Sequence, residues 1–171
     1  MTESKDPAQP ASTDSSRMSR FGFKKPRIFP PVWLLLCGLA IAALHNWLPL
    51  LQLYPKLPGW SGWLMVIPGL VLIIIALKGF KRAKTGAIPF SESTALVTDG
   101  IYRFTRNPMY LGMALILAGI ALRLGSLSVW LPVIFFVFII QRQFVRNEEI
   151  FLTAIYGDEF RQYCRKVRPW L

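Results

Sequence analysis

The sequence has few of the residues on which disulfide frameworks and metal centres depend. Its 171 residues include two cysteines and one histidine. Cys37 lies inside an apolar run and Cys164 lies in a basic tail, so the chain has neither a disulfide framework nor a CxxC metal motif. With His45 as the single histidine, a histidine-rich metal site is excluded as well. We therefore expect no metal site.

Acidic residues are also scarce, and they are unevenly distributed. The chain has nine Asp and Glu against 20 Lys and Arg, which gives a net charge of +11. Such a charge would suit a nucleic-acid-binding protein if it covered a soluble surface. Long stretches are almost uncharged, however, and only 17% of all residues are charged, whereas soluble domains average about 25%. We therefore exclude a soluble nucleic-acid-binding protein and expect a membrane protein.

Long apolar runs are the dominant feature that the sequence does have. Residues 32–51 and 60–77 each approach the length of about 20 residues that a membrane-spanning helix needs. Residues from Met109 to Val145 are apolar apart from a short break at 123–126, which predicts a tight hairpin of two helices, 109–123 and 127–145. The expected fold is thus an all-α integral membrane protein with about four transmembrane helices.

The two ends of the chain differ from these runs. Residues 1–30 are rich in Ser, Pro, Lys and Arg without apolar periodicity, and they predict a disordered basic arm before a single membrane domain, 31–171. The tail 146–171 alternates charges with Phe, Ile, Tyr and Trp. This pattern predicts a C-terminal amphipathic helix that lies against the membrane face.

Basic residues fall almost entirely on one side of this scheme. Eighteen of the 20 Lys and Arg lie in residues 1–31, in residues 78–108 and in the tail from Arg142, and the two opposite loops hold only Lys56 and Arg123. Because Lys and Arg accumulate in cytoplasmic segments, both termini are expected to be cytoplasmic. The expected location is a bacterial inner membrane.

Two polar clusters border the predicted hairpin. One ends in Asn107-Pro108, which fits a helix start with Asn as the N-cap and Pro at the first helical position. The other spans residues 141–149 and includes Glu148 and Glu149. A hairpin that turns near residue 126 brings the two clusters to one level. A helix start there leaves backbone N–H groups free for an anionic ligand group.

The two glutamates admit two interpretations. They could form a solvated face that balances Arg142 and Arg146. Alternatively, a carboxylate beside an apolar helix end could accept hydrogen bonds from ribose hydroxyls or from an amine. The residues alone leave both interpretations open.

The two clusters carry a resemblance to a known family. The run Gly-Ile-Tyr-Arg-Phe-Thr-Arg-Asn-Pro-Met-Tyr-Leu-Gly at 100–112 is followed by Asn-Glu-Glu-Ile-Phe-Leu at 147–152 and by Tyr-Gly-Asp-Glu-Phe-Arg-Gln-Tyr at 156–163. Together they resemble the isoprenylcysteine carboxyl methyltransferase family. The related phospholipid methyltransferases share the Arg-His-Pro-x-Tyr-x-Gly and Glu-Glu elements. The resemblance covers roughly residues 75–171.

The resemblance implies an integral membrane methyltransferase that uses S-adenosylmethionine without a Rossmann domain. In that family the cofactor occupies a pocket on the cytoplasmic side, closed by the C-terminal segment, and a lipophilic acceptor (a lipid or a lipophilic small molecule) enters from the bilayer. Matched by motif, the cofactor contacts are Thr94, Ala95, Leu96, Val97, Tyr102, Asn107, Pro108, Met109, Tyr110 and Glu148.

This chain departs from the family pattern at the acceptor side. Asn107 and Thr94 stand where the eukaryotic enzymes usually have His, and the family's carboxylate-binding arginine aligns near Phe144. The flanking Arg142 and Arg146 are then the candidates for acceptor binding. A carboxylate acceptor is already ionised and needs no base, whereas an amine acceptor would need one of the two glutamates. No catalytic residue is assigned, and both acceptor classes stay open.

Two other functions are compatible with the same sequence. Membrane sterol reductases have a similar C-terminal helical framework and bind NADPH. A non-catalytic lipid-binding membrane protein could also keep this fold. Binding of S-adenosylmethionine, of NADPH or of neither discriminates the three.

Overall fold

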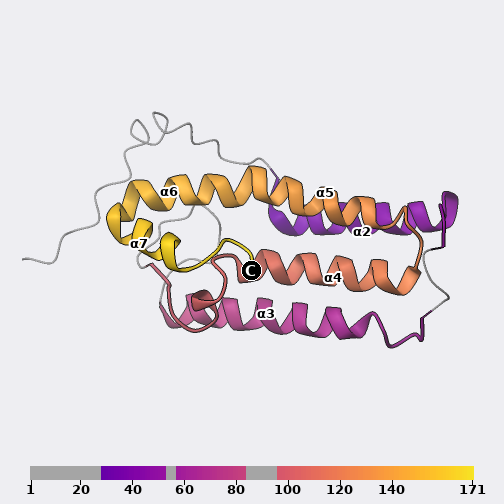
Figure 1. Cartoon of the computed structure of the whole chain (residues 1–171), viewed down its shortest axis with the longest axis horizontal. Coiled ribbons are helices and arrows are strands. Elements are labelled where there is room, and N and C mark those ends of the chain that lie inside the picture. The colour runs from indigo at the N-terminus through magenta and orange to yellow at the C-terminus, as the bar shows by residue number, and fades with distance from the viewer. Residues whose placement is uncertain (1–27, 53–56, 84–95) are drawn as a thin grey trace, which may run out of the picture.

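The computed structural model describes residues 28–52, 57–83 and 96–171, and within these ranges it contains helices and one isolated β-bridge but no strands. This confirms the all-α class (Figure 1). The elements are α2 Pro30–Trp47, α3 Trp63–Arg82, the 3₁₀ helix η1 Gly100–Arg103, α4 Pro108–Leu124, α5 Trp130–Ile140, the π-helical turn η2 Gln141–Val145, α6 Arg146–Tyr156 and α7 Asp158–Lys166. The predicted arm lies almost wholly outside the described residues.

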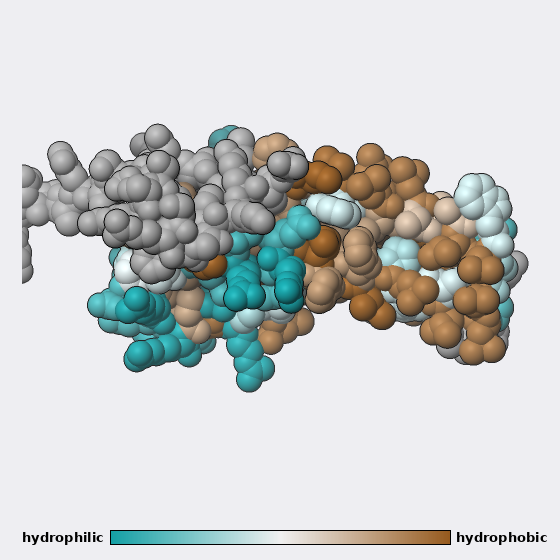
Figure 2. Space-filling model, turned by 90° about the horizontal axis from the view of Figure 1, so that it is seen from above, coloured by the Kyte–Doolittle hydropathy of each residue, from teal (hydrophilic) through white to brown (hydrophobic). Residues whose placement is uncertain are grey.

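The long helices run side by side, with α4 between its neighbours. The helix α3 packs along one side of α4, and α2 and α5 pack on its other side (Figure 1). The elements α5, η2 and α6 continue one another as a single rod from Trp130 to Tyr156. In Figure 2, hydrophilic residues gather at the end of the molecule formed by α6 and α7, and hydrophobic residues cover the opposite part.

Several predicted helix bounds are corrected by local backbone chemistry. The first helix ends at Trp47 and not at 51, because proline disfavours helical geometry at the residue before it, here Leu48 (φ −143°, ψ 62°). The tail is not one amphipathic helix but two, because Gly157 at φ 53° separates α6 from α7. The hairpin is confirmed, and its first arm ends at Gly125 in the left-handed conformation (φ 75°) that closes many helices.

Two helices have the length and composition of membrane spans. These are α2, with 18 residues, and α3, with 20 residues, while α4 is an apolar helix of 17 residues. That α4 and α5 also span the membrane, as the scheme of four spans requires, therefore stays a prediction. The side of the membrane on which the termini lie likewise stays a prediction.

Close backbone contact joins α3 to α4. A Cβ atom added to Gly112 would lie 2.5 Å from the carbonyl oxygen of Gly69, and one added to Gly119 would lie 2.6 Å from that of Gly62. Small residues of this kind let two helix backbones approach closely in membrane proteins. Gly112 thus serves the packing of α4 on α3.

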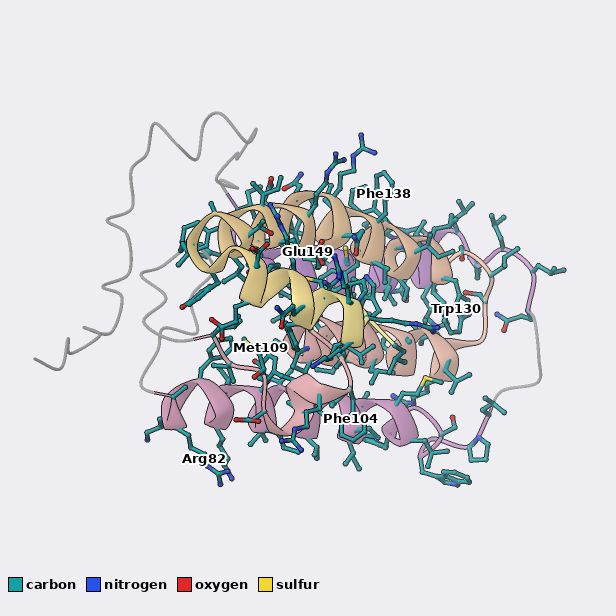
Figure 3. The ribbon with its side chains drawn as sticks, turned by 60° about the vertical axis from the view of Figure 1, so that its left-hand side comes forward. Arg82, Phe104, Met109, Trp130, Phe138 and Glu149 are labelled. Carbon is teal, nitrogen blue, oxygen red and sulfur yellow. The ribbon has the colours of Figure 1, made fainter. Side chains whose placement is uncertain are left out.

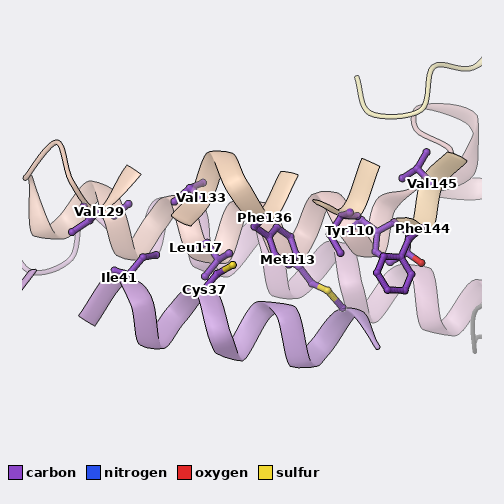
Figure 4. Packing of buried hydrophobic residues seen from close by; sticks show 12 residues of the cluster. Cys37, Ile41, Tyr110, Met113, Leu117, Val129, Val133, Phe136, Phe144 and Val145 are labelled. Atoms are coloured by element: carbon purple, nitrogen blue, oxygen red, sulfur yellow. The ribbon is translucent and has the colours of Figure 1, made fainter. Parts of the chain in front are cut away.

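The hydrophobic core lies where α2, α4 and α5 meet (Figure 4). Leu117 of α4 and Phe136 of α5 are at most 1% exposed, and Ile41 of α2 is equally buried. Toward the polar end, the rings of Tyr110 and Phe144 pack with their centroids 6.1 Å apart. This packing fixes the start of α4 against the rod formed by α5 and α6, and so it positions the groups described next.

Candidate active site

A cavity of about 380 Å³ opens at the N-terminal end of α4. Its volume is in the range of small-molecule sites, about 300–1,000 Å³. Its walls come from the start of α2, the end of α3, η1, the start of α4 and α6. The lining residues are Phe29, Pro30, Pro31, Phe80, Tyr102, Arg106, Asn107, Pro108, Met109, Tyr110, Met113 and Glu148.

The start of α4 forms the polar floor of this cavity. Pro108 occupies the first helical position, as predicted, because its ring fixes φ near the helical value and it has no N–H to satisfy. Asn107 stands at the N-cap position, but its side chain does not cap the helix. Its Nδ2 instead donates a hydrogen bond of 2.9 Å to the carbonyl oxygen of Pro169. Met109, the residue that follows Pro108 at the start of α4, is labelled in Figure 3.

Glu148 reaches the cavity from α6. The hydroxyl of Tyr110 donates a hydrogen bond of 2.7 Å to Glu148 Oε1. The two predicted clusters therefore meet, and the interpretation of Glu148 as part of a solvated face is wrong. Burial raises the pKa of Glu148 to about 7, and the neighbouring Glu149 adds to the increase, while the hydrogen bond from Tyr110 opposes it. Glu148 is thus poised between its two protonation states near neutral pH.

Glu149 has a different partner. Its Oε1 lies 2.7 Å from a terminal nitrogen of Arg106, whose side chain is 12% exposed. Burial raises the pKa of Glu149, and the Arg106 guanidinium opposes the increase. Because Arg106 also lines the cavity, this ion pair connects α6 to the cavity wall. The arginine paired with Glu149 is thus Arg106, and not Arg142 or Arg146.

Two buried polar atoms of cavity-lining residues lack partners in the described part of the chain. Tyr102 Oη and Arg106 Nε are both buried, and neither makes a hydrogen bond within the described part of the chain. Buried polar groups are nearly always satisfied in native proteins, so each such atom needs an explanation. Burial also raises the pKa of Tyr102, so its hydroxyl stays protonated and is able to donate a hydrogen bond.

The last residues of the chain, 167–171, cross the start of α4 and are called the C-terminal strap. The backbone N–H of Arg106 donates to the carbonyl oxygen of Arg168 over 3.0 Å. Trp170 Nε1 donates a hydrogen bond of 2.6 Å to Gln141 Oε1, in the π-helical turn η2. Together with the bond from Asn107 to Pro169, these contacts tie the strap to both sides of the predicted hairpin.

Six of the ten residues predicted to contact the cofactor line this cavity. They are Tyr102, Asn107, Pro108, Met109, Tyr110 and Glu148. Leu96 lines a neighbouring surface groove instead, and Val97 packs near Gly79, so neither belongs to the cavity wall. Thr94 and Ala95 lie outside the described residues.

The two arginines predicted to bind the acceptor do not line the cavity. Both Arg142 and Arg146 are exposed. Arg142 lies over the ring of Phe138, with 6.0 Å between its guanidinium carbon and the ring centroid. The side chains point outward because they lie on the face of the η2–α6 segment opposite to Phe144 and Val145, which are buried.

The structure adds lining residues that the sequence analysis missed. Arg106 could have been found, because it is the basic residue directly before Asn-Pro in the motif. Phe80 at the end of α3 and the first turn of α2 had no such signal. They reach the cavity only because three helices that are distant in sequence end beside one another.

Comparison with known proteins places this arrangement in a family. The sequence profile of the phospholipid methyltransferases matches residues 58–159, which is more than half of the chain and includes both halves of the site. The chain belongs to the phospholipid methyltransferase family. The predicted family is thereby confirmed, and with it the enzyme class, a methyltransferase.

Relatives of this phospholipid methyltransferase family member include proteins from bacteria, fungi and plants. An uncharacterized protein of Haemophilus influenzae is 44% identical over 63 residues, which are 37% of this chain and all of that protein. Protein-S-isoprenylcysteine O-methyltransferase of Schizosaccharomyces pombe is 35% identical over 42% of this chain. A probable enzyme of the same name from Oryza sativa subsp. indica is 29% identical over 70% of it.

This chain spans only part of the two named relatives. The matched region covers 30% of the Schizosaccharomyces pombe protein and 66% of the Oryza sativa protein. No solved structure matches the chain. The methyl donor and the acceptor are therefore treated as proposals.

Proposed function

We propose that this protein transfers a methyl group from S-adenosylmethionine to a lipophilic acceptor at the cytoplasmic face of a membrane. The observation that carries the proposal is the cavity at the start of α4, where Glu148 and Tyr110 meet in a hydrogen bond of 2.7 Å. Six residues that the family motifs assign to the cofactor line this one cavity.

The residues present fit S-adenosylmethionine. Tyr102 and Arg106 line the cavity, and their hydroxyl and guanidinium groups are donors suited to a carboxylate or a hydroxyl. Glu148 is an acceptor for ribose hydroxyls or for an ammonium group, and the first N–H groups of α4 favour an anionic group. The rings of Phe80, Tyr102 and Tyr110 offer faces that attract a cation. The cofactor carries each of these chemical groups.

The protein's contribution to the reaction is positioning and exclusion of water. When bound, S-adenosylmethionine would supply a methyl group that is activated by the positive charge on its sulfur. The methyl group would bond to a lone pair of the acceptor, and the electron pair of the carbon–sulfur bond would stay with sulfur. Because that methyl group is already activated, alignment of the two reactants can supply most of the acceleration. The C-terminal strap and the Arg106–Glu149 ion pair hold the cavity wall in place for this alignment.

Glu148 adds a possible proton acceptor for one class of acceptor. A carboxylate acceptor is ionised at neutral pH and needs no base. An amine acceptor must lose a proton, and Glu148, with its pKa near 7, could receive it. The proposal accommodates both acceptor classes.

A ligand screen tests the choice of cofactor. The full chain in detergent is heated with S-adenosylmethionine, with S-adenosylhomocysteine or with NADPH. A ligand at about 100 times its Kd stabilises a protein by about 2.7 kcal/mol, so the first two should raise the unfolding temperature. Stabilisation by NADPH alone would favour a membrane reductase, and stabilisation by none of the three a non-catalytic lipid-binding protein.

A further inference from the structure

The cavity has two chemically different ends. At one end lie Tyr102, Arg106, Asn107 and Glu148, which carry its polar atoms. The other end is formed by the first turn of α2, Phe29–Pro31, together with Met113 of α4. Figure 4 shows the side chain of Met113 extending from α4 toward the N-terminal end of α2. Only carbon and sulfur side chains face the cavity there.

The start of α2 differs from the start of α4 because it offers the cavity no hydrogen-bond donor. Pro30 and Pro31 have no N–H. The next two amides, of Val32 and Trp33, both donate to the carbonyl oxygen of Phe29, over 3.0 Å and 3.4 Å. This helix start therefore lacks the free N–H groups that make other helix starts attract anions. A hydrocarbon group fits it, and a charged group does not.

The two prolines also hold Phe29 in place. A residue before proline is restricted to extended geometry, and Phe29 has φ −71° and ψ 151°. Its side chain is 57% exposed, while Pro30 behind it is buried. The backbone of Phe29 is thus set in extended geometry, and the residue lies at the edge of the cavity.

An apolar strip continues from this wall along α2. Val32, Leu36 and Leu39 follow Phe29 at helical spacing and are 44%, 45% and 59% exposed. The strip runs along a helix that has the length and composition of a membrane span. It connects the apolar end of the cavity with the part of the molecule that would face lipid chains.

From these observations we propose that Phe29–Pro31 and Met113 form the acceptor subsite. The hydrocarbon chain of a lipophilic acceptor lies against Phe29 and along α2, and its reacting group points toward the polar end. This inference rests on the proposed function. The family match begins at residue 58, so the α2 part of the subsite belongs to a region outside it and would set which acceptor this particular chain takes.

The test separates acceptor recognition from cofactor binding. The full chain and the variants Phe29→Ala, Phe29→Trp and Leu35→Ala are purified in detergent. Leu35 is the matched control, because it lies on α2 and is 62% exposed but does not line the cavity. Affinity for S-adenosylhomocysteine is measured by calorimetry. Transfer of a tritiated methyl group from S-adenosylmethionine is measured with three acceptor probes, each at increasing concentration. The probes are a total lipid extract, dioleoylphosphatidylethanolamine and N-acetyl-S-farnesylcysteine.

We expect Phe29→Ala to raise the acceptor concentration at half-maximal rate by about tenfold, because the hydrocarbon chain loses an apolar wall. Phe29→Trp should change the ratio of rates between the straight-chain and the branched isoprenoid probe. Neither substitution should change the affinity for S-adenosylhomocysteine, and Leu35→Ala should change neither quantity.

Three results would overturn the subsite. One is a Phe29→Ala enzyme with unchanged acceptor dependence, and another is a Phe29→Ala enzyme that loses cofactor affinity, since the cofactor would then occupy the apolar end. The third is a wild-type enzyme that binds S-adenosylhomocysteine but methylates none of the three lipophilic probes. A wild-type protein that does not bind the cofactor at all would instead refute the proposed function, and the subsite with it.

Discussion

Glu148 and Glu149 are adjacent and chemically identical, yet the fold gives them separate partners. Successive residues of a helix point about 100° apart, so Glu148 meets Tyr110 while Glu149 meets Arg106. The first contact lies in the cavity floor, and the second braces its wall. The two residues should therefore respond differently to substitution.

The first prediction concerns cofactor affinity. Glu148→Ala removes the acceptor in the cavity floor, and a hydrogen bond to a charged group contributes about 1.5–3 kcal/mol. Affinity for S-adenosylhomocysteine should fall about tenfold to a hundredfold, with unchanged expression and membrane insertion. Glu159→Ala, at an exposed position of α7, is the control. If Glu148→Ala binds as tightly as the wild type, the cofactor lies elsewhere.

The second prediction concerns pH. Glu148 has a pKa of about 7 in the fold, above its ordinary value of 4.5, so between these values the folded protein holds a proton that the unfolded chain has released. The ligand-free protein should therefore lose stability as pH rises from 4.5 through 7.

Glu148→Gln, which keeps an acceptor for Tyr110, isolates this contribution from that of other groups. Its unfolding temperature should match that of the wild type near pH 4.5 and exceed it at pH 8. Parallel curves for the two proteins across this range would show that the Glu148 carboxyl keeps an ordinary pKa.

At the scale of the elements, the packing of α3 on α4 decides where the cavity lies. The contact between Gly69 and Gly112 brings the two helices together one turn from Met109. The ring of Tyr102, in η1, packs against Gly79 of α3, where an added Cβ atom would lie 3.3 Å from Tyr102 Cε2. Any side chain at the glycine contact must push the helices apart. That displacement would also move the start of α4.

The third prediction therefore compares two glycine substitutions. Gly112→Ala places a Cβ atom 2.5 Å from the Gly69 carbonyl oxygen, and overpacking of this kind costs about 1–3 kcal/mol. Gly38→Ala meets no atom within 4 Å, and alanine gains up to about 1 kcal/mol of helix propensity. Thermal unfolding in detergent should show a lower midpoint for the first variant and an equal or higher one for the second. The reverse order would refute the close contact.

The fourth prediction concerns the C-terminal strap. Deletion of residues 168–171 removes the bonds from Asn107, the Arg106 amide and Trp170, and a buried polar group left unpaired costs about 1–3 kcal/mol. Affinity for S-adenosylhomocysteine should fall about tenfold. Deletion of Leu171 alone, which is 77% exposed, should leave it unchanged. Equal affinities for the two truncated proteins would show that the strap does not support the cavity.

At the scale of the whole molecule, the polar end formed by α6 and α7 also holds the end of α3 and the start of α4 (Figures 1 and 2). Lys and Arg accumulate in residues 78–108 and in the tail from Arg142, and the described parts of both lie at this end. Charge distribution and helix arrangement thus agree on one common side. By the positive-inside rule, we predict that this side is cytoplasmic.

The fifth prediction follows from this asymmetry. Reporter fusions after residues 30, 90 and 171 should all be cytoplasmic, and a fusion at residue 56 should be external. The measurement is the activity of a phosphatase that is active only outside and of a fluorescent protein that folds only inside. An external C-terminus would separate Glu148 from the cytoplasm and contradict the proposed site.

Local sequence patterns were sufficient to predict most of the helices and to place the two halves of the candidate site. The lengths of the apolar runs predict the helices, and proline and glycine predict most of their ends. The turn of the hairpin near residue 126 brings Tyr110 and Glu148 to the same level, where they form a hydrogen bond. These features are local or depend on a single turn, which is why the motif residues could be assigned before the fold was known.

Which other residues line the cavity depends on how the helices pack. The π-helical turn at Gln141–Val145 has no simple sequence signal, yet it continues α5 into α6 and turns Arg142 outward while Glu148 faces inward. The start of α2 lines the cavity, and the C-terminal strap holds its wall through contacts between segments more than 60 residues apart, such as the bond from Asn107 to Pro169. Such pairings depend on how whole helices pack, and helix packing is set by shape complementarity that no local pattern encodes.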